Sequence, residues 1–187
     1  MLFLSPSQKR FLSSLNPLLL GGLVYLLIIV RTATDPILPS ILRQWDLLLP
    51  FVVYVGQRRT LIEGILLVLF ISHLFSLASV APIGVFAVYY LALFFLARLL
   101  VYAVFANTWV TILGVLFLVS IVSRILLPLV TFFFGFTWSL LSFKNVMVGS
   151  FFVNAILGLF FYLVLSLVDR LTFKVNAISI ELLEGEV

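Results

Sequence analysis

Ionisable side chains inside apolar stretches are the first places where this sequence could do chemistry. His73 stands between Ser72 and Ser76 in an apolar run, and an imidazole there could shuttle a proton or bind a ligand. We favour the plainer interpretation, a neutral imidazole hydrogen-bonded to a neighbouring helix. Arg124 also lies in an apolar run, where a charge is costly and usually faces a partner or a cavity. It is close to Pro128, so its side chain could equally reach the membrane surface, and both interpretations stay open.

The sequence offers little for a catalytic centre. It contains no cysteine and one histidine, which excludes disulfides, thiolate catalysis and cysteine-rich or histidine-rich metal sites. The paired carboxylates of acid–base catalysis are missing, and so are the motifs of serine hydrolases, zinc proteases and phosphate-binding loops. A serine hydrolase would need His73 as its base, with Ser72 or Ser76 on the same helix. We therefore expect no enzyme activity, no catalytic residues, no cofactor and no metal.

A pair of adjacent arginines, Arg58-Arg59, separates two apolar runs. Their guanidinium groups could grip a lipid phosphate or the carboxylate of a partner. The alternative, which we favour, is that they only set the orientation of the chain in the membrane. Glu63 follows Arg59 by four residues, a spacing that places both side chains on one helix face and allows an ion pair.

The elements that must position these residues are membrane helices. The chain has 187 residues, of which 64% are hydrophobic and 10% charged, whereas a soluble domain is about half apolar and about a quarter charged. Such a chain cannot cover its surface with polar groups, so its solvent is largely lipid. Its basic residues are not clustered as nucleic-acid binding requires. We expect one integral membrane domain over residues 1–187, an all-α bundle.

Hydropathy divides the chain into about six spans. The first is interpreted as a retained span rather than a signal peptide, with Pro17 in its first turn. The second is short for a hydrocarbon core of ~30 Å, so it must be tilted, thinned or shielded by its neighbours. The fifth is expected to stop at Pro128. The predicted spans are 11–30, 46–57, 61–80, 85–102, 109–127 and 146–168, followed by a short cytoplasmic tail, 169–187.

The distribution of Lys and Arg predicts the orientation, because cytoplasmic loops of membrane proteins carry an excess of both. With six spans and a cytoplasmic N-terminus, three basic residues fall outside: Arg31, Arg43 and Lys144. Seven fall inside: Lys9, Arg10, Arg58, Arg59, Arg98, Arg170 and Lys174. We therefore expect both termini in the cytoplasm.

Small and polar residues recur at helical spacing in two of the spans. Such stripes let membrane helices approach closely. They are most often used for packing within a chain, and a groove for a partner's transmembrane helix has the same pattern. The candidate docking residues are Gly64, Ser72, Ser76 and Ser79 in the third span, and Ser150, Asn154 and Gly158 in the sixth.

Residues 45–100 resemble the MreD family of rod shape-determining proteins. A short span opens with an acidic residue and a proline, an arginine pair follows, and a glycine opens the next span. A Pro-aliphatic-Gly turn and an aromatic-rich span ending in arginine complete the pattern. The residues concerned are Asp46, Pro50, Arg58-Arg59, Gly64, Pro82-Ile83-Gly84 and Arg98. The chain differs from the family at Thr60, where glycine is usual, and it lacks the acidic residue often found before the turn.

The resemblance implies a non-enzymatic scaffold of the bacterial cell-elongation machinery in the cytoplasmic membrane. The implied partner is an MreC-like protein with a single transmembrane helix, within a complex of MreB filaments, RodZ, RodA and a penicillin-binding protein. The family's fold is thought similar to the S components of energy-coupling-factor transporters. A substrate-binding S component for a vitamin or metal is therefore the alternative, although the first span offers only Gly21-Gly22 where S components usually carry an Ala-x-x-x-Ala docking surface.

Overall fold

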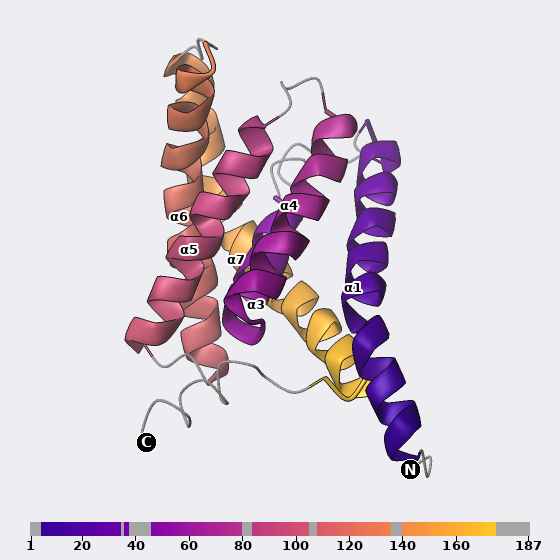
Figure 1. Cartoon of the computed structure of the whole chain (residues 1–187). Coiled ribbons are helices and arrows are strands. Elements are labelled where there is room, and N and C mark those ends of the chain that lie inside the picture. The colour runs from indigo at the N-terminus through magenta and orange to yellow at the C-terminus, as the bar shows by residue number, and fades with distance from the viewer. Residues whose placement is uncertain are drawn as a thin grey trace.

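The part of the chain that the structure describes folds into a bundle of six helices (Figure 1). The structure is a computed structural model that describes residues 5–34, 36–37, 46–79, 84–104, 108–135 and 140–174, with backbone only for 6, 104 and 140–150. No strand occurs within these ranges. The helices are α1 (Pro6–Thr34), α3 (Leu48–Arg58), α4 (Leu61–Leu77), α5 (Val85–Val104), α6 (Trp109–Phe133) and α7 (Leu140–Leu171).

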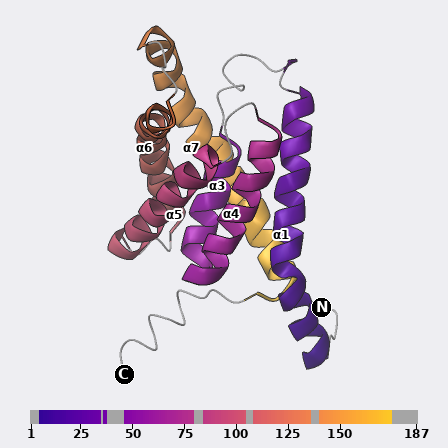
Figure 2. The same cartoon turned by 45° about the horizontal axis from the view of Figure 1, so that its top comes forward.

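Successive helices run in alternating directions, so α1 begins at the end of the bundle where α7 finishes (Figures 1 and 2). α3 packs against α4, α5, α6 and α7 and occupies the middle of the bundle. α1 stands at one margin, in contact with α4 and α7. Four helices, α1, α5, α6 and α7, are long and apolar enough to cross a membrane, as expected for a membrane protein.

The short central helix α3 is shielded by its neighbours. Its 11 residues rise only about 16 Å at 1.5 Å per residue, roughly half of the ~30 Å hydrocarbon core. All residues from Leu48 to Gln57 are buried. A helix that is apolar on every side belongs in a core, so of the three ways to accommodate this short run, shielding is the one the structure uses.

The prolines do not mark helix ends as the sequence suggested. Pro17 lies inside α1, not in its first turn, and α6 continues through Pro128 to Phe133. Prolines are tolerated in membrane helices because neighbouring groups satisfy the freed backbone atoms. Asp169, at the start of the predicted tail, belongs to α7 and is buried. Residues 175–187 lie outside the described ranges.

Glycines let α4 approach its neighbours. A Cβ on Gly64 would lie 2.6 Å from the Phe94 ring of α5 and 3.3 Å from Val55 of α3. Phe94 is fully buried, so the ring has little room to move away. Gly64 is therefore part of the intramolecular contact among α3, α4 and α5.

Replacing Gly64 by alanine is expected to destabilise the bundle by about 1–3 kcal/mol, the usual cost of overpacking a filled core. Thermal or denaturant unfolding of the purified protein in detergent measures the loss. Gly22→Ala is the matched control, because no atom lies within 4 Å of the added Cβ. Equal stability of the two variants would contradict the packing described.

Candidate functional site

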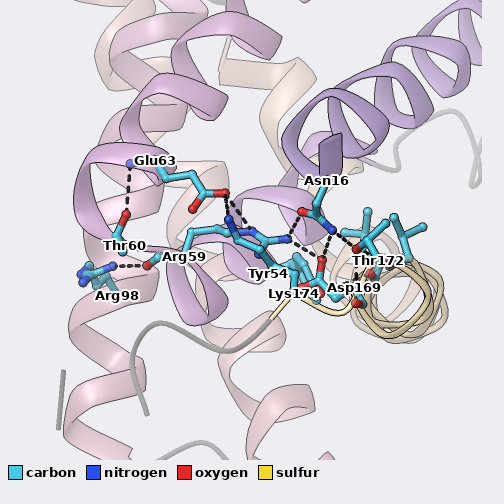
Figure 3. A network of polar contacts seen from close by, with 11 residues as sticks. Asn16, Tyr54, Arg59, Thr60, Glu63, Arg98, Asp169, Thr172 and Lys174 are labelled. Atoms are coloured by element: carbon cyan, nitrogen blue, oxygen red, sulfur yellow. Dashed lines mark hydrogen bonds and ion pairs between the residues drawn. The ribbon is translucent and has the colours of Figure 1, made fainter. Parts of the chain in front are cut away.

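Arg59, at the end of α3, is completely buried. Its Nη2 donates to the Asp169 carboxylate of α7 and, at 2.6 Å, to the Asn16 side-chain oxygen of α1 (Figure 3). Asn16 in turn donates to Asp169 at 2.8 Å and to Thr172. One guanidinium thus joins three helices that are far apart in sequence. These side chains lie at the end of the bundle where α1 begins and α7 finishes, which carries most of the basic residues and which we call the basic end. The cluster there, the basic-end cluster, consists of Asn16, Tyr54, Arg59, Glu63, Asp169, Thr172 and Lys174.

Further hydrogen bonds complete the surroundings of the Arg59–Asp169 pair. The Tyr54 hydroxyl donates to the second oxygen of Asp169. The backbone carbonyl of Arg59 accepts from Arg98 of α5 at 2.8 Å. A buried ion pair is best tolerated when its remaining donors and acceptors find partners. Tyr54 supplies one for the Asp169 carboxylate, whereas Nε and Nη1 of Arg59 are buried without a hydrogen bond.

Glu63 and Lys174 are the more exposed members of the cluster, with side chains 21% and 22% exposed. The predicted pairing of Glu63 with Arg59 is confirmed, with Nε and Oε1 3.7 Å apart. Lys174 Nζ lies 3.2 Å from the same Oε1. Arg58 points elsewhere and donates to the Tyr162 hydroxyl at 3.1 Å. The two adjacent arginines therefore have different surroundings, and Arg59 is too deeply buried to grip a lipid phosphate.

A second polar cluster lies at the opposite end of α3. Asp46 turns its carboxylate into the bundle and accepts from the Leu48 and Leu49 N–H groups at 3.1 and 3.3 Å. It also accepts from the hydroxyls of Tyr90 and Tyr89 at 3.0 and 3.2 Å. The negative charge sits at a helix N-terminus, where the helix dipole favours it.

Arg124 belongs to this second cluster. Its side chain is half-buried, and its charge interacts electrostatically with the Asp46 carboxylate. Asn154 accepts from the Asp46 backbone N–H at 3.0 Å and donates to Ser120 at 3.0 Å. The predicted docking residue Asn154 is therefore fully engaged inside the chain.

The other stripe residues also face inward. Gly64, Ser72 and Ser76 are buried, and a Cβ on Gly158 would lie 3.4 Å from Leu116 of α6. A partner helix cannot reach these positions without displacing the chain's own helices, so they serve packing. Ser79 is partly exposed, and the side chain of Ser150 lies outside the described residues.

His73 was expected to be buried, and that expectation is wrong. Its side chain is exposed on the surface of α4. The adjacent Ser72 is buried, and one residue along a helix turns the side chain by roughly 100°. His73 therefore points away from Ser72, while the Ser76 hydroxyl donates to the Ser72 carbonyl at 2.9 Å. Among the described residues, no three His, Cys, Asp or Glu side chains gather where they could hold a metal ion.

A groove runs between α1 and α4 along the outside of the bundle. Two cavities, of about 870 and 430 Å³, share Tyr25 and Leu74 in their walls and so follow one another along α1. From Pro17 to Ala33, α1 rises about 24 Å, close to the thickness of the hydrocarbon core. Apart from Glu63, the residues in the groove walls are uncharged and mostly apolar. The lining residues are Pro17, Leu18, Gly21, Gly22, Tyr25, Thr60, Ile62, Glu63, Leu66, Leu67, Phe70 and Leu74 in the larger cavity, and Tyr25, Ile28, Ile29, Thr32, Ala33, Leu74, Leu77 and Ala78 in the smaller.

No protein-family model matches the chain, and neither a curated protein nor a solved structure is significantly similar to it. The resemblance to MreD proteins therefore rests on its short motif alone. Several described residues of that motif belong to α3 or contact it. Asp46 caps α3, Pro50 lies in its first turn, Arg58 and Arg59 end it, and Arg98 binds the Arg59 carbonyl.

Sequence reasoning missed Asp169 and Asn16 as the partners of Arg59. The chain has only seven acidic residues, and Asp169 stands at the end of a span on the side with most basic residues. That position was a usable signal for a pairing with one of those arginines. The choice of Arg59 over Arg58 or Arg98 depends on the packing of α3 against α7, which the sequence pattern does not contain.

Arg59→Met is expected to cost about 3–5 kcal/mol, because it leaves the buried Asp169 carboxylate without its cation. The double variant Arg59→Met/Asp169→Leu should recover part of this loss, because neither charge then remains unpaired. Unfolding in detergent measures both variants. Arg170→Gln, on the exposed neighbour of Asp169, should stay within about 0.5 kcal/mol of the parent. A double variant as unstable as the sum of the single variants would refute the coupling.

Proposed function

We propose that this protein is a non-enzymatic scaffold of the bacterial cell-elongation machinery and that it binds the transmembrane helix of an MreC-like partner. The α1–α4 groove carries the proposal. Its length suits a membrane-crossing helix, and its mostly apolar walls suit a lipid-embedded surface better than a polar solute. Gly21 and Gly22 form part of one wall, and small residues allow the close backbone approach that membrane helices use.

The docking surface therefore differs from the one the sequence suggested. Gly64, Ser72 and Ser76 of α4 and Asn154 and Gly158 of α7 are buried, whereas the walls of the α1–α4 groove are open. Leu18 is 72% exposed, Leu66 62% and Phe70 55%. MreB filaments, RodZ, RodA and a penicillin-binding protein would join through the MreC-like partner or through other faces of the bundle.

The alternative function, an S component, finds less support. A captured vitamin needs a cavity between the helices, and α3 fills the middle of this bundle with buried side chains. The two cavities beside α1 face outward from the bundle instead. Asp46, Pro50, Arg58, Arg59 and Arg98, which belong to the motif shared with MreD proteins, lie in α3 or bind its ends, which supports a family likeness centred on this helix.

The proposed orientation places both ends of the chain in the cytoplasm with six spans, α3 being a shielded half-length one. The end where α1 begins and α7 finishes carries seven basic residues in the described ranges (Figure 1). They are Lys9, Arg10, Arg58, Arg59, Arg98, Arg170 and Lys174. Arg31 lies in the last turn of α1, at the opposite end. This asymmetry favours a cytoplasmic basic end.

The absence of native cysteine permits a direct test of this orientation. In intact spheroplasts, a membrane-impermeant maleimide should label Ile37→Cys, whose parent residue is 85% exposed at the opposite end. Ser7→Cys and Arg170→Cys, both at exposed positions of the basic end, should react only after permeabilisation. Labelling of either one in intact spheroplasts would overturn the orientation.

Site-specific photocrosslinking in the native membrane tests the docking function. A photoreactive amino acid at Leu66, on the groove wall, should crosslink a single-span MreC-like protein, whereas one at Leu118, exposed on α6, should not. Gly22→Trp should fill the groove and lower the yield at least about tenfold, equal to 1.4 kcal/mol of binding free energy.

Two results would contradict the proposal. Equal yields from Leu66 and Leu118 would remove the groove as the binding surface. Co-purification with paired ATPases and a coupling subunit, in place of an MreC-like protein, would favour the transporter function.

A further inference from the structure

Glu63 is the charged residue in the wall of the α1–α4 groove. It lines the larger cavity near Thr60 and Pro17, at the basic end of the bundle. Its side chain is 21% exposed, so it is reachable from the groove. A carboxylate in a membrane is costly unless a cation faces it, and here Arg59 and Lys174 lie beside Glu63.

The Glu63 carboxylate has unused hydrogen-bonding capacity. Its Oε1 is buried and accepts no hydrogen bond, although Arg59 Nε and Lys174 Nζ lie 3.7 and 3.2 Å away. A carboxylate offers about four acceptor positions. Arg59 is held in place by Asp169 and Asn16, so it cannot turn fully toward Glu63 (Figure 3).

The membrane-spanning helix expected in the groove carries a cationic hydrogen-bond donor at the level of Glu63. A single-span helix carries Lys or Arg at its cytoplasmic flank, as the positive-inside rule requires. When such a helix lies in the groove, that flank is level with the basic end of the bundle and hence with Glu63. An ammonium or guanidinium group there can make a charge-assisted hydrogen bond with the Glu63 carboxylate once Lys174 has moved away.

We propose that Glu63 binds a Lys or Arg at the cytoplasmic flank of the membrane-spanning helix in the α1–α4 groove, in exchange for Lys174. This inference rests on the proposed docking function. Within the cluster, two carboxylates, Glu63 and Asp169, face two cations, Arg59 and Lys174. Exchange of Lys174 for the incoming cation preserves that balance. Lys174 is the exchangeable member because it is 22% exposed, whereas the Arg59 side chain is 1% exposed.

The experiment uses the full chain in its native membrane, with the photoreactive residue at Leu66 as the probe of occupancy. Glu63→Gln keeps the size of the side chain and removes its charge, and it should lower the crosslinking yield about tenfold. Lys174→Gln should raise the yield, because it removes the competing cation. A merely structural role for the cluster predicts a loss in both variants, so the opposite signs separate the two explanations. Arg170→Gln, a neighbouring exposed cation, should leave the yield unchanged.

Swapping the two charges between Glu63 and the partner's basic residue distinguishes loss of binding from misfolding of a variant. Glu63→Lys should abolish the crosslink, and replacement of the captured helix's flanking basic residue by Glu should restore it. If Gly22→Trp lowers the yield while Glu63→Gln leaves it within about twofold, the Glu63 inference fails and the docking function stands. If Leu66 crosslinks no helix, both fail. Crosslinks only to lipid, or to a second copy of this chain, would likewise overturn the inference.

Discussion

The length of α3 is the constraint on which the rest of the structure depends. Eleven residues cannot reach across the hydrocarbon core, so this helix must end inside or at the edge of the bundle. Helix ends leave backbone N–H and C=O groups without partners, and in a membrane each such group costs several kcal/mol. The chain therefore has to bring polar side chains to both ends of α3 while it covers the helix on every side with apolar residues.

Both polar clusters follow from this requirement. At the N-terminal end, Asp46 accepts from backbone N–H groups of α3 and is itself held by tyrosines of α5. At the C-terminal end, Arg98 donates to the Arg59 carbonyl, and the Arg59 side chain is neutralised by Asp169. Asn16 ties α1 to the same pair. The margin helix is thereby held at the basic end, and along the rest of its length it forms one wall of the groove.

Hydropathy was sufficient to predict where the helices lie in the sequence, but not which helices and side chains contact one another. Each of the six predicted spans falls on a described helix, but among the described helices only α1, α5, α6 and α7 are long and apolar enough to cross a membrane. The predicted helix start near Pro17 and the predicted helix end at Pro128 were wrong, because a membrane helix tolerates proline within its length. The sequence did not reveal which face of α4 is buried. This helix is apolar nearly all round, so its pattern does not separate the buried Ser72 from the exposed His73. The Arg59–Asp169 contact spans 110 residues, and the groove depends on the gap between α1 and α4, neither of which a local pattern encodes.

The distance along the chain between Arg59 and Asp169 also bears on how the protein is made. Synthesis proceeds from the N-terminus, so the cation at the end of α3 leaves the ribosome long before its carboxylate. Until α7 is inserted, Arg59 has Glu63 as its nearby acidic group, and α3, too short to span the bilayer alone, lacks one of the helices that cover it. The last described helix therefore completes the core rather than adding to a finished one. Assembly of this bundle is a step that follows insertion of all its helices.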